Sequence, residues 1–258
     1  MFFIFFILLN LCGTIICEDD ISSAGLLEIG HGLRIPRLGF GTAGLGMETK
    51  KVICYALSSG IRFFDTAQAR EWYFEEGLGD ALEECWPTDK IDEIAIVTKI
   101  HPRSYDRDNM EKAIFESKNY LYRNVSRPLD AVLLHAPFCW WEQCTDHDRS
   151  RSWKSAWNHL EHYHTAGQIH NIGVSNFNEV ELSELLQITN KKIALIQNWM
   201  DPFHQDKIVR EICKIHNIKY MAYSSLGTQH NRPQNPVLTN PLLQSIASKH
   251  GRRIKFYH

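Results

Sequence analysis

Short apolar runs alternate with longer amphipathic stretches along most of the chain. Seven runs have the length and composition of buried strands, and they cover residues 38–42, 61–64, 94–97, 131–134, 169–174, 193–196 and 218–222. Between them, apolar residues recur three and four positions apart, which predicts helices over 49–58, 74–84, 107–122, 152–166, 179–187 and 205–216. This alternation is typical of repeated strand–helix units around a parallel sheet.

The number and spacing of these units favour a (β/α)8 barrel, with an open parallel sheet as the alternative that periodicity alone leaves open. A small hairpin is predicted before the first strand, over residues 27–29 and 33–35, with its turn at Gly30-His31-Gly32. A helix over 242–250 should lead into an eighth strand, but the chain ends at His258 without one. The sequence therefore predicts a barrel domain over 18–258 that is truncated before strand eight, with two sheet edges unpaired.

The first segment differs from the rest of the chain. Residues 2–16 carry no charge, and three acidic residues follow at positions 18–20. Because a membrane-spanning helix needs about 20 apolar residues, we expect no stable membrane span. A secretory signal peptide over residues 1–17 is the favoured interpretation, with an uncleaved anchor or a mispredicted start codon as alternatives. A real signal would send the protein to the secretory pathway or outside the cell, and otherwise it would be cytoplasmic.

Composition narrows the function classes. The chain has 258 residues, 44% of them hydrophobic and 22% charged, which is enough to bury the core of one large domain. A formal net charge of -2 gives no indication of a nucleic-acid partner. The cysteines outside the leader are scattered and odd in number, although Cys139 and Cys144 are close enough to pair in a loop. Neither a CxxC nor an HExxH pattern occurs, so no metal site is predicted.

Polar side chains follow the predicted strands directly. Among them are Asp65, Lys99, His135, Ser175, Asn176, Gln197 and Tyr223. The carboxyl ends of the strands of a parallel barrel open on one face, where such barrels place their active sites. Each residue alone has a structural explanation, because strands commonly end in a polar residue. An acid, a base and a histidine on successive strand ends together predict an active site.

These residues lie in motifs that resemble those of the aldo-keto reductases. The motifs are IPRLGFGT at 35–42, GIRFFDTA at 60–67, VTK at 97–99, LHAP at 134–137, IGVSNF at 172–177 and AYSSLG at 222–227. Any one of them is a weak signal, but the ordered set spans roughly residues 26–250. The resemblance implies an oxidoreductase that reduces a small-molecule aldehyde or ketone with hydride from NADPH, NADH not being excluded. It does not indicate the oligomeric state.

The resemblance also implies a catalytic tetrad of Asp, Tyr, Lys and His. Asp65, Lys99 and His135 match three of these positions. The family places the Tyr five residues after the Asp, where this chain has Arg70, and the segment that follows is about two residues longer than usual. Tyr73 is therefore the candidate proton donor, with an aromatic packed at the start of a helix as the alternative.

The expected chemistry of the tetrad follows from its charges. Tyr73 would donate a proton to the carbonyl oxygen, although an unperturbed tyrosine has a pKa of about 10. The Lys99 ammonium would lower that pKa, and Asp65 would hold Lys99 in place. His135 would orient the carbonyl and donate a hydrogen bond to its oxygen.

The same comparison implies a set of cofactor-binding residues. Ser175, Asn176 and Gln197 match family positions that hydrogen-bond the nicotinamide carboxamide. Tyr223 matches the aromatic residue on which the nicotinamide ring stacks, and Ser224 and Leu226 match residues near the pyrophosphate. These groups would fix one face of the ring toward the substrate.

Other possibilities stay open at this point. Aromatic residues after His135, namely Phe138, Trp140 and Trp141, would suit an apolar carbonyl substrate or would simply pack in a loop. The displaced Tyr and the absence of a recognisable C-terminal segment that grips the adenosine phosphate favour a second hypothesis, a binding or scaffold protein without turnover. A barrel hydrolase has less support, because no nucleophile, carboxylate pair or metal site is assembled.

Overall fold

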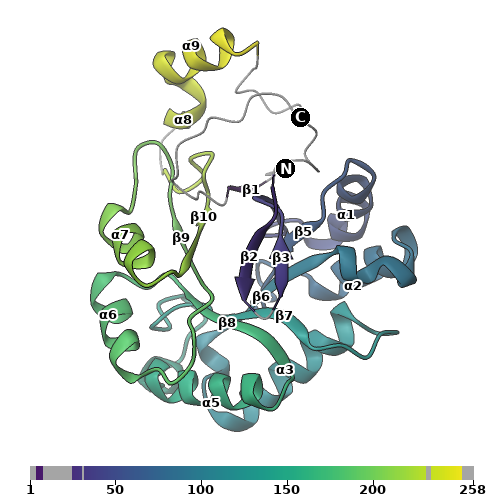
Figure 1. Cartoon of the computed structure of the whole chain (residues 1–258), viewed down its shortest axis with the longest axis vertical. Helices are drawn as coiled ribbons and strands as arrows, with labels where there is room; N and C mark the ends of the chain where they lie inside the picture. Colours follow the sequence, from purple (N-terminus) through teal and green to yellow (C-terminus); the bar gives the residue numbers. More distant parts are fainter. Residues whose placement is uncertain (1–3, 8–24, 31, 231–233, 252–258) are drawn as a thin grey trace.

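Eight strands close into a barrel in the computed structural model, which describes residues 4–7, 25–30, 32–230 and 234–251 (Figure 1). Seven of these strands run parallel, as the alternating pattern predicts. They are β4 (Leu38–Gly41), β5 (Phe63–Asp65), β6 (Ala95–Ile100), β7 (Leu129–Leu134), β8 (Ile169–Ser175), β9 (Leu195–Trp199) and β10 (Lys219–Tyr223). The predicted (β/α)8 barrel is therefore confirmed, and the open sheet is excluded.

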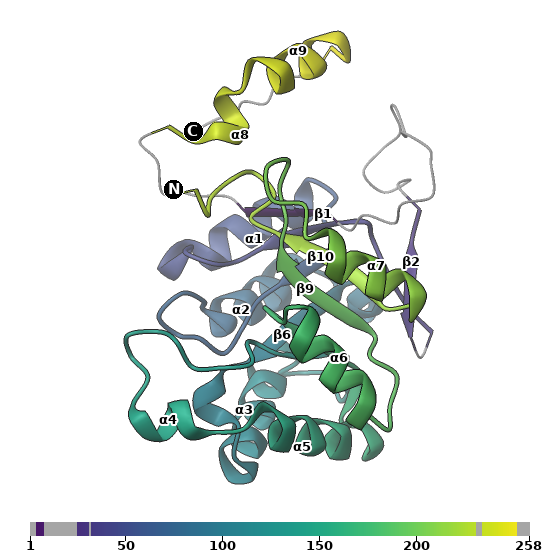
Figure 2. The same cartoon turned by 90° about the vertical axis from the view of Figure 1, so that its left-hand side faces the viewer.

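Most helices surround the strands on the outside of the barrel, whereas the last two along the chain lie beyond one end of it (Figures 1 and 2). Those predicted from periodicity are α1 (Thr49–Ser58), α2 (Glu75–Cys85), α3 (Arg107–Leu121), α5 (Trp153–Thr165), α6 (Glu179–Ile188), α7 (Lys207–Ile215) and α9 (Pro241–Lys249). Two short helices, α4 (Asp146–Ser150) and α8 (Pro236–Thr239), were not predicted, because a single turn shows no periodicity. Each is instead started by a side-chain cap, from Thr145 in α4 and from Asn235 in α8. No helix in the described part of the chain is long and apolar enough to cross a membrane.

The eighth position of the barrel is occupied by β1 (Ile4–Ile7), which lies between β4 and β10. It is antiparallel to both neighbours, and Ile7 pairs with Leu38 on one side and Ala222 on the other. The expectation of two unpaired sheet edges was therefore wrong. The gap is filled by an N-terminal run without a preceding crossover helix, because only a parallel strand requires one. The rest of the predicted leader and the segment 252–258 lie outside the described residues.

The predicted hairpin is confirmed as β2 (Leu27–Gly30) and β3 (Leu33–Ile35). Its buried side chains pack with residues near the amino ends of the strands, such as Phe63 and Ala95. The hairpin thus covers one end of the barrel. Its opposite, carboxyl end is the one at which the candidate site residues stand.

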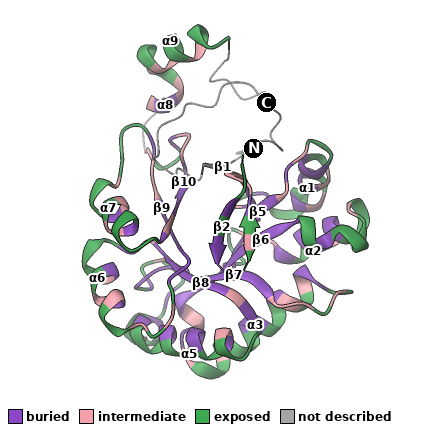
Figure 3. Ribbon diagram, viewed as in Figure 1, coloured by how far each residue is buried: buried purple, intermediate pink, exposed green. Residues whose placement is uncertain are grey.

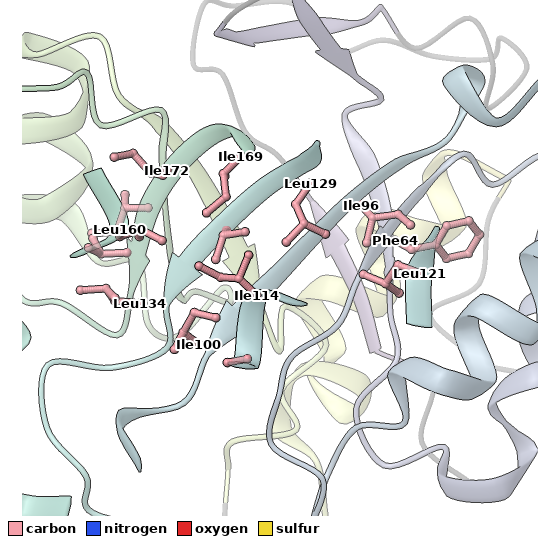
Figure 4. Packing of buried hydrophobic residues seen from close by; sticks show 14 of the residues in the cluster. Phe64, Ile96, Ile100, Ile114, Leu121, Leu129, Leu134, Leu160, Ile169 and Ile172 are labelled. Carbon is pink, nitrogen blue, oxygen red and sulfur yellow. The ribbon is translucent and has the colours of Figure 1, made fainter. Parts of the chain in front are cut away.

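Two apolar layers hold the barrel together, one inside it and one between its outer face and the helices. Phe63 and Val97 belong to the inner layer. Phe64 and Ile96 belong to the outer layer, part of which is seen in Figure 4. Because side chains alternate between the faces of a strand, residues two positions apart share a face. The same alternation therefore turns Asp65 and the other strand-end candidates toward the barrel interior. In Figure 3 the strands are mostly buried, and exposure is concentrated on the outer faces of the helices.

Two disulfides link parts of the surface. Cys54 of α1 is bonded to Cys85 of α2, a pair 31 residues apart that the sequence analysis did not identify. Cys139 is bonded to Cys144, the pair that its spacing suggested. The first pair could not be foreseen, because it depends on two helices lying side by side in the barrel.

Candidate active site

A buried ion pair lies at the carboxyl ends of neighbouring strands β5 and β6. The ammonium Nζ of Lys99 donates to Oδ2 of Asp65 at 2.7 Å and to the backbone oxygen of Thr66 at 2.8 Å. The Asp65 side chain is 0% exposed and the Lys99 side chain 1%. Charges this deeply buried are stable only as a pair with further hydrogen bonds.

Burial sets the electrostatics of this pair. Burial disfavours both charges, so it raises the pKa of Asp65 and lowers the pKa of Lys99. The attraction between the two charges partly offsets both shifts. Gln197 adds a hydrogen bond from Nε2 to Oδ1 of Asp65 at 2.5 Å. The carboxylate is therefore held on both oxygens, which fixes the direction in which Lys99 points.

Tyr73 reaches the same place from the loop between β5 and α2. The additional residues of this loop form a turn, in which the backbone N–H groups of Trp72 and Tyr73 both donate to the carbonyl of Ala69. The Tyr73 ring lies 6.0 Å from the His135 ring and 5.0 Å from Nζ of Lys99, measured to ring centroids. Arg70, which stands at the usual position of the tyrosine, is largely exposed and pairs with Glu116. The turn thus brings all four tetrad candidates together.

The charge environment of Tyr73 differs from the expected one. Burial raises the pKa of Tyr73, and the neighbouring Asp65 and Tyr223 raise it further. The pKa of Tyr73 is therefore raised overall, and no lowering by Lys99 outweighs the effect of burial. The physical reason is that the ammonium lies over the face of the ring, a cation–π contact, while its hydrogen bonds go to Asp65 and Thr66.

His135 is placed as an electrically neutral donor. Burial lowers its pKa well below the ordinary value, and the nearby Lys99 and His101 lower it further. The side chain is buried, and Nδ1 has no hydrogen-bond partner among the described residues. An unpaired buried polar atom is costly, so Nδ1 of His135 is an unsatisfied group within the site.

The candidate cofactor residues form one connected set. The hydroxyl of Tyr223 donates to Oδ1 of Asn176 at 2.7 Å, and Nδ2 of Asn176 donates to Oγ of Ser175 at 3.1 Å. Ser175 in turn donates to the backbone oxygen of Gln197 at 2.8 Å. Since Gln197 also contacts Asp65, the two groups of site residues are continuous.

Two of these residues have strained backbones. Asn176 has φ 60° and Ser224 has φ 50°, both in the left-handed region that L-residues other than glycine rarely adopt. Such outliers are frequent at ligand-binding sites. The remaining candidate, Leu226, lies in the loop after β10, where its backbone oxygen accepts from Asn235 at 2.7 Å. No hydrogen bond of the described residues joins Ser224 or Leu226 to the tetrad.

The sequence analysis missed two residues at the site. Glu75 is buried at the start of α2 and accepts from Thr98 at 2.5 Å and Ser117 at 2.9 Å. Its pKa is raised, chiefly by burial. His101 follows β6 and packs beside His135, with ring centroids 6.1 Å apart. The only sequence signal for His101 was its place two residues after Lys99, on the same face of the extended chain.

A cavity of about 730 Å³ opens next to Tyr73, which is the one tetrad candidate among its described lining residues. Tyr73, Glu75, His101 and Arg103 contribute to its lining. Its volume lies in the range of small-molecule sites. His101 also lies with Cys139 and Cys144 in a group whose potential metal ligands are within 4.8 Å of one another. Because the two sulfurs are bonded to each other, they offer no thiolate to a metal in this state.

The burial of His101 predicts a pH-dependent stability. Its pKa is lowered from 6.5 to about 4 by burial and by Arg103. Below about pH 6.5 the unfolded chain takes up a proton that the folded chain does not, so stability falls as the pH drops from about 6.5 to about 4. Urea midpoints across this range test the prediction. His101→Asn, which keeps an acceptor for the Arg103 N–H, should reduce the slope, and an unchanged slope would contradict it.

Comparison with known proteins shows which family the chain is similar to. A family model described as the aldo/keto reductase family matches residues 37–255. The NADPH-dependent codeinone reductase 1-1 of Papaver somniferum is 32% identical over 243 residues, covering 89% of this chain and 74% of that protein. The D-galacturonate reductase of Fragaria ananassa is 30% identical over 246 residues, covering 92% and 73%.

Solved structures give the same result for the fold. An aldo/keto reductase from Brucella melitensis aligns with a TM-score of 0.74 and 25% identity, covering 90% of this chain and 81% of that one. An aldo-keto reductase from Bombyx mori in complex with NADP aligns with a TM-score of 0.76 and 24% identity, covering 90% and 77%. At that level of identity the second likeness shows the fold alone.

Proposed function

Because the chain belongs to the aldo/keto reductase family, we propose that it reduces an aldehyde or ketone carbonyl at the carboxyl end of the barrel, using NADPH. The observation that carries the proposal is the buried Lys99–Asp65 pair, with Tyr73 and His135 gathered around it. A lysine and an aspartate that only supported the fold would gain little from such burial. Perturbed ionisable groups that converge at one place are typical of a catalytic site.

The residues present fit a nicotinamide cofactor. Ser175, Asn176 and Gln197 offer hydroxyl and amide groups that match the donors and acceptors of a carboxamide, and Tyr223 offers an aromatic face. Ser175, Asn176 and Tyr223 are hydrogen-bonded in sequence and can exchange such bonds for a ligand at little cost. When bound, NADPH supplies the hydride. The similar protein from Papaver somniferum is named as an NADPH-dependent reductase, which supports NADPH as the cofactor.

The side chains divide the remaining work. Neutral His135 donates a hydrogen bond to the carbonyl oxygen and orients it. Tyr73 delivers the proton that this oxygen needs once it gains negative charge, and the raised pKa of Tyr73 keeps the proton in place until then. Asp65 and Gln197 fix Lys99, whose ammonium stabilises the anionic charge that the proton transfer leaves near the tyrosine.

Two measurements on the full chain test the proposal. Titration with NADPH should quench tryptophan fluorescence saturably, and a panel of aldehydes and ketones should then give carbonyl-dependent loss of NADPH absorbance. NADH in parallel shows which cofactor is preferred. Saturable binding without turnover on any carbonyl would favour the second hypothesis, a binding protein on a reductase barrel.

We propose further that the apolar N-terminal segment directs the chain into the secretory pathway. Cleavage after residue 17 would remove β1 and leave β4 and β10 as unpaired sheet edges in the exported protein. The two disulfides support the proposal, since disulfides persist mainly in oxidising compartments. The test is expression in a secreting eukaryotic cell, followed by N-terminal sequencing of the exported protein. Retention of the intact chain in the cytosol would contradict the proposal.

A further inference from the structure

The Cys139–Cys144 disulfide closes a small loop directly after the active-site end of β7. Both cysteines are buried, at 3% and 4% exposure, although the residues between them lie at the surface. The backbone N–H of Cys144 donates to the oxygen of Trp141 at 3.0 Å, so the loop turns tightly at Trp141. A covalent ring this short leaves Trp141 few positions to adopt.

The Trp141 ring lies against two histidines of the candidate active site. The Trp141 ring lies 5.3 Å from the His135 ring and 4.7 Å from the His101 ring, and Trp140 stacks on it at 5.0 Å. Trp141 is only half-buried, so part of its ring surface is open. A carbonyl compound hydrogen-bonded to His135 would therefore bring its substituent beside Trp141.

The far end of the loop is anchored independently. Arg151, just after α4, donates to the backbone oxygen of Arg103 and pairs with Asp106 at 3.0 Å and Asp148 at 2.5 Å. Asp148 in turn completes the cap of α4 with Thr145, the residue after Cys144. These contacts hold the end of the loop against the segment that follows β6 and carries His101. The disulfide holds residues 140–143 at the beginning of the loop.

We propose that the Cys139–Cys144 disulfide positions Trp141 as a wall of the substrate pocket, and that this wall selects carbonyl compounds with an aromatic group. The proposal rests on the proposed function. Aromatic rings of ligand and protein attract each other at the centroid distances that Trp141 already makes with its neighbours. A small aliphatic aldehyde reaches His135 without covering the open part of this ring, so it gains nothing from Trp141.

The test compares 4-nitrobenzaldehyde with propanal in the full chain. Trp141→Ala should lower kcat/KM for the aromatic aldehyde roughly tenfold and for propanal no more than about twofold. Trp141→Leu, which keeps the site apolar, should show the same preference with less structural disturbance. Trp86→Ala is the matched control, because Trp86 lies at the end of α2 beneath the Arg62 guanidinium. Equal losses on both substrates would overturn the proposal.

The role of the disulfide needs a second set of variants. Cys139→Ser with Cys144→Ser should reduce the same preference for the aromatic aldehyde, whereas Cys54→Ser with Cys85→Ser should leave it unchanged. Adding the two cysteine substitutions to Trp141→Ala should cause no further loss, because the disulfide acts through Trp141. Additive losses would show that it does not. A wild-type chain inactive on the whole carbonyl panel would overturn the proposed function and this inference with it. Inactivity on these two aldehydes alone, or an active wild type with unaltered preference in every variant, would overturn the inference only.

Discussion

Replacing Lys99 with methionine should lower turnover by a factor of about 10² to 10⁴. Methionine removes the ammonium that stabilises charge near Tyr73 while filling much of the same volume. It also leaves Asp65 as a buried carboxylate held only by Gln197 and cut off from solvent. We therefore expect a loss of stability of about 3–5 kcal/mol in the same variant. Steady-state kinetics and urea unfolding measure the two effects separately.

A double variant distinguishes catalysis from folding. Lys99→Met combined with Asp65→Asn removes both charges, so most of the lost stability should return while turnover stays low. Recovery of activity together with stability would show that the ion pair only supports the fold. Normal turnover in Lys99→Met would exclude the proposed role of the lysine outright.

Tyr73→Phe should lower kcat by a similar factor, about 10² to 10⁴, and leave unfolding nearly unchanged. Phenylalanine keeps the ring that packs against His135 and Lys99 and removes only the hydroxyl that would carry the proton. Quenching by NADPH should persist, because the candidate cofactor contacts come from β8, β9 and β10. The measurements are kcat, the NADPH titration and the urea midpoint.

Tyr55→Phe is the matched control for this variant. Tyr55 is 73% exposed on α1, so loss of its hydroxyl should change none of the three measurements. If Tyr73→Phe turned over at the wild-type rate, the proton would have to come from another group. The packing interpretation of Tyr73 would then be preferred.

The position of most site residues could be predicted because a strand has a strict period of two. Once Phe63 and Val97 are recognised as core residues, Asp65 and Lys99 must lie on the same inward face, one step nearer the carboxyl end. Parallel strands carry those ends to one side of the barrel. The same reasoning places His135 and Gln197, which is why short motifs were enough to assemble the ring of candidates.

Features outside the strands were harder to predict. The place of Tyr73 depends on a turn at Ala69, and the sequence indicated only that this loop has additional residues. Its charge environment could not be inferred at all, because whether Lys99 meets a ring or a hydroxyl depends on side-chain orientation. The pairing of β1 with β4 and β10 was equally hidden, since an apolar run of this kind is compatible with a leader as well as a strand.

The hydrogen bond between Gln197 and Asp65 joins residues that are 132 positions apart in the chain. Lys99, by contrast, is only 34 positions from Asp65, so the ion pair can form within the first half of the molecule. Contacts between distant segments form late in folding, because the intervening chain must first be ordered. During refolding, helical structure and the first half-barrel should therefore appear before Gln197 arrives on β9. Reductase activity should therefore return more slowly than the circular dichroism signal of secondary structure. The rate at which activity returns would report a late step of barrel assembly.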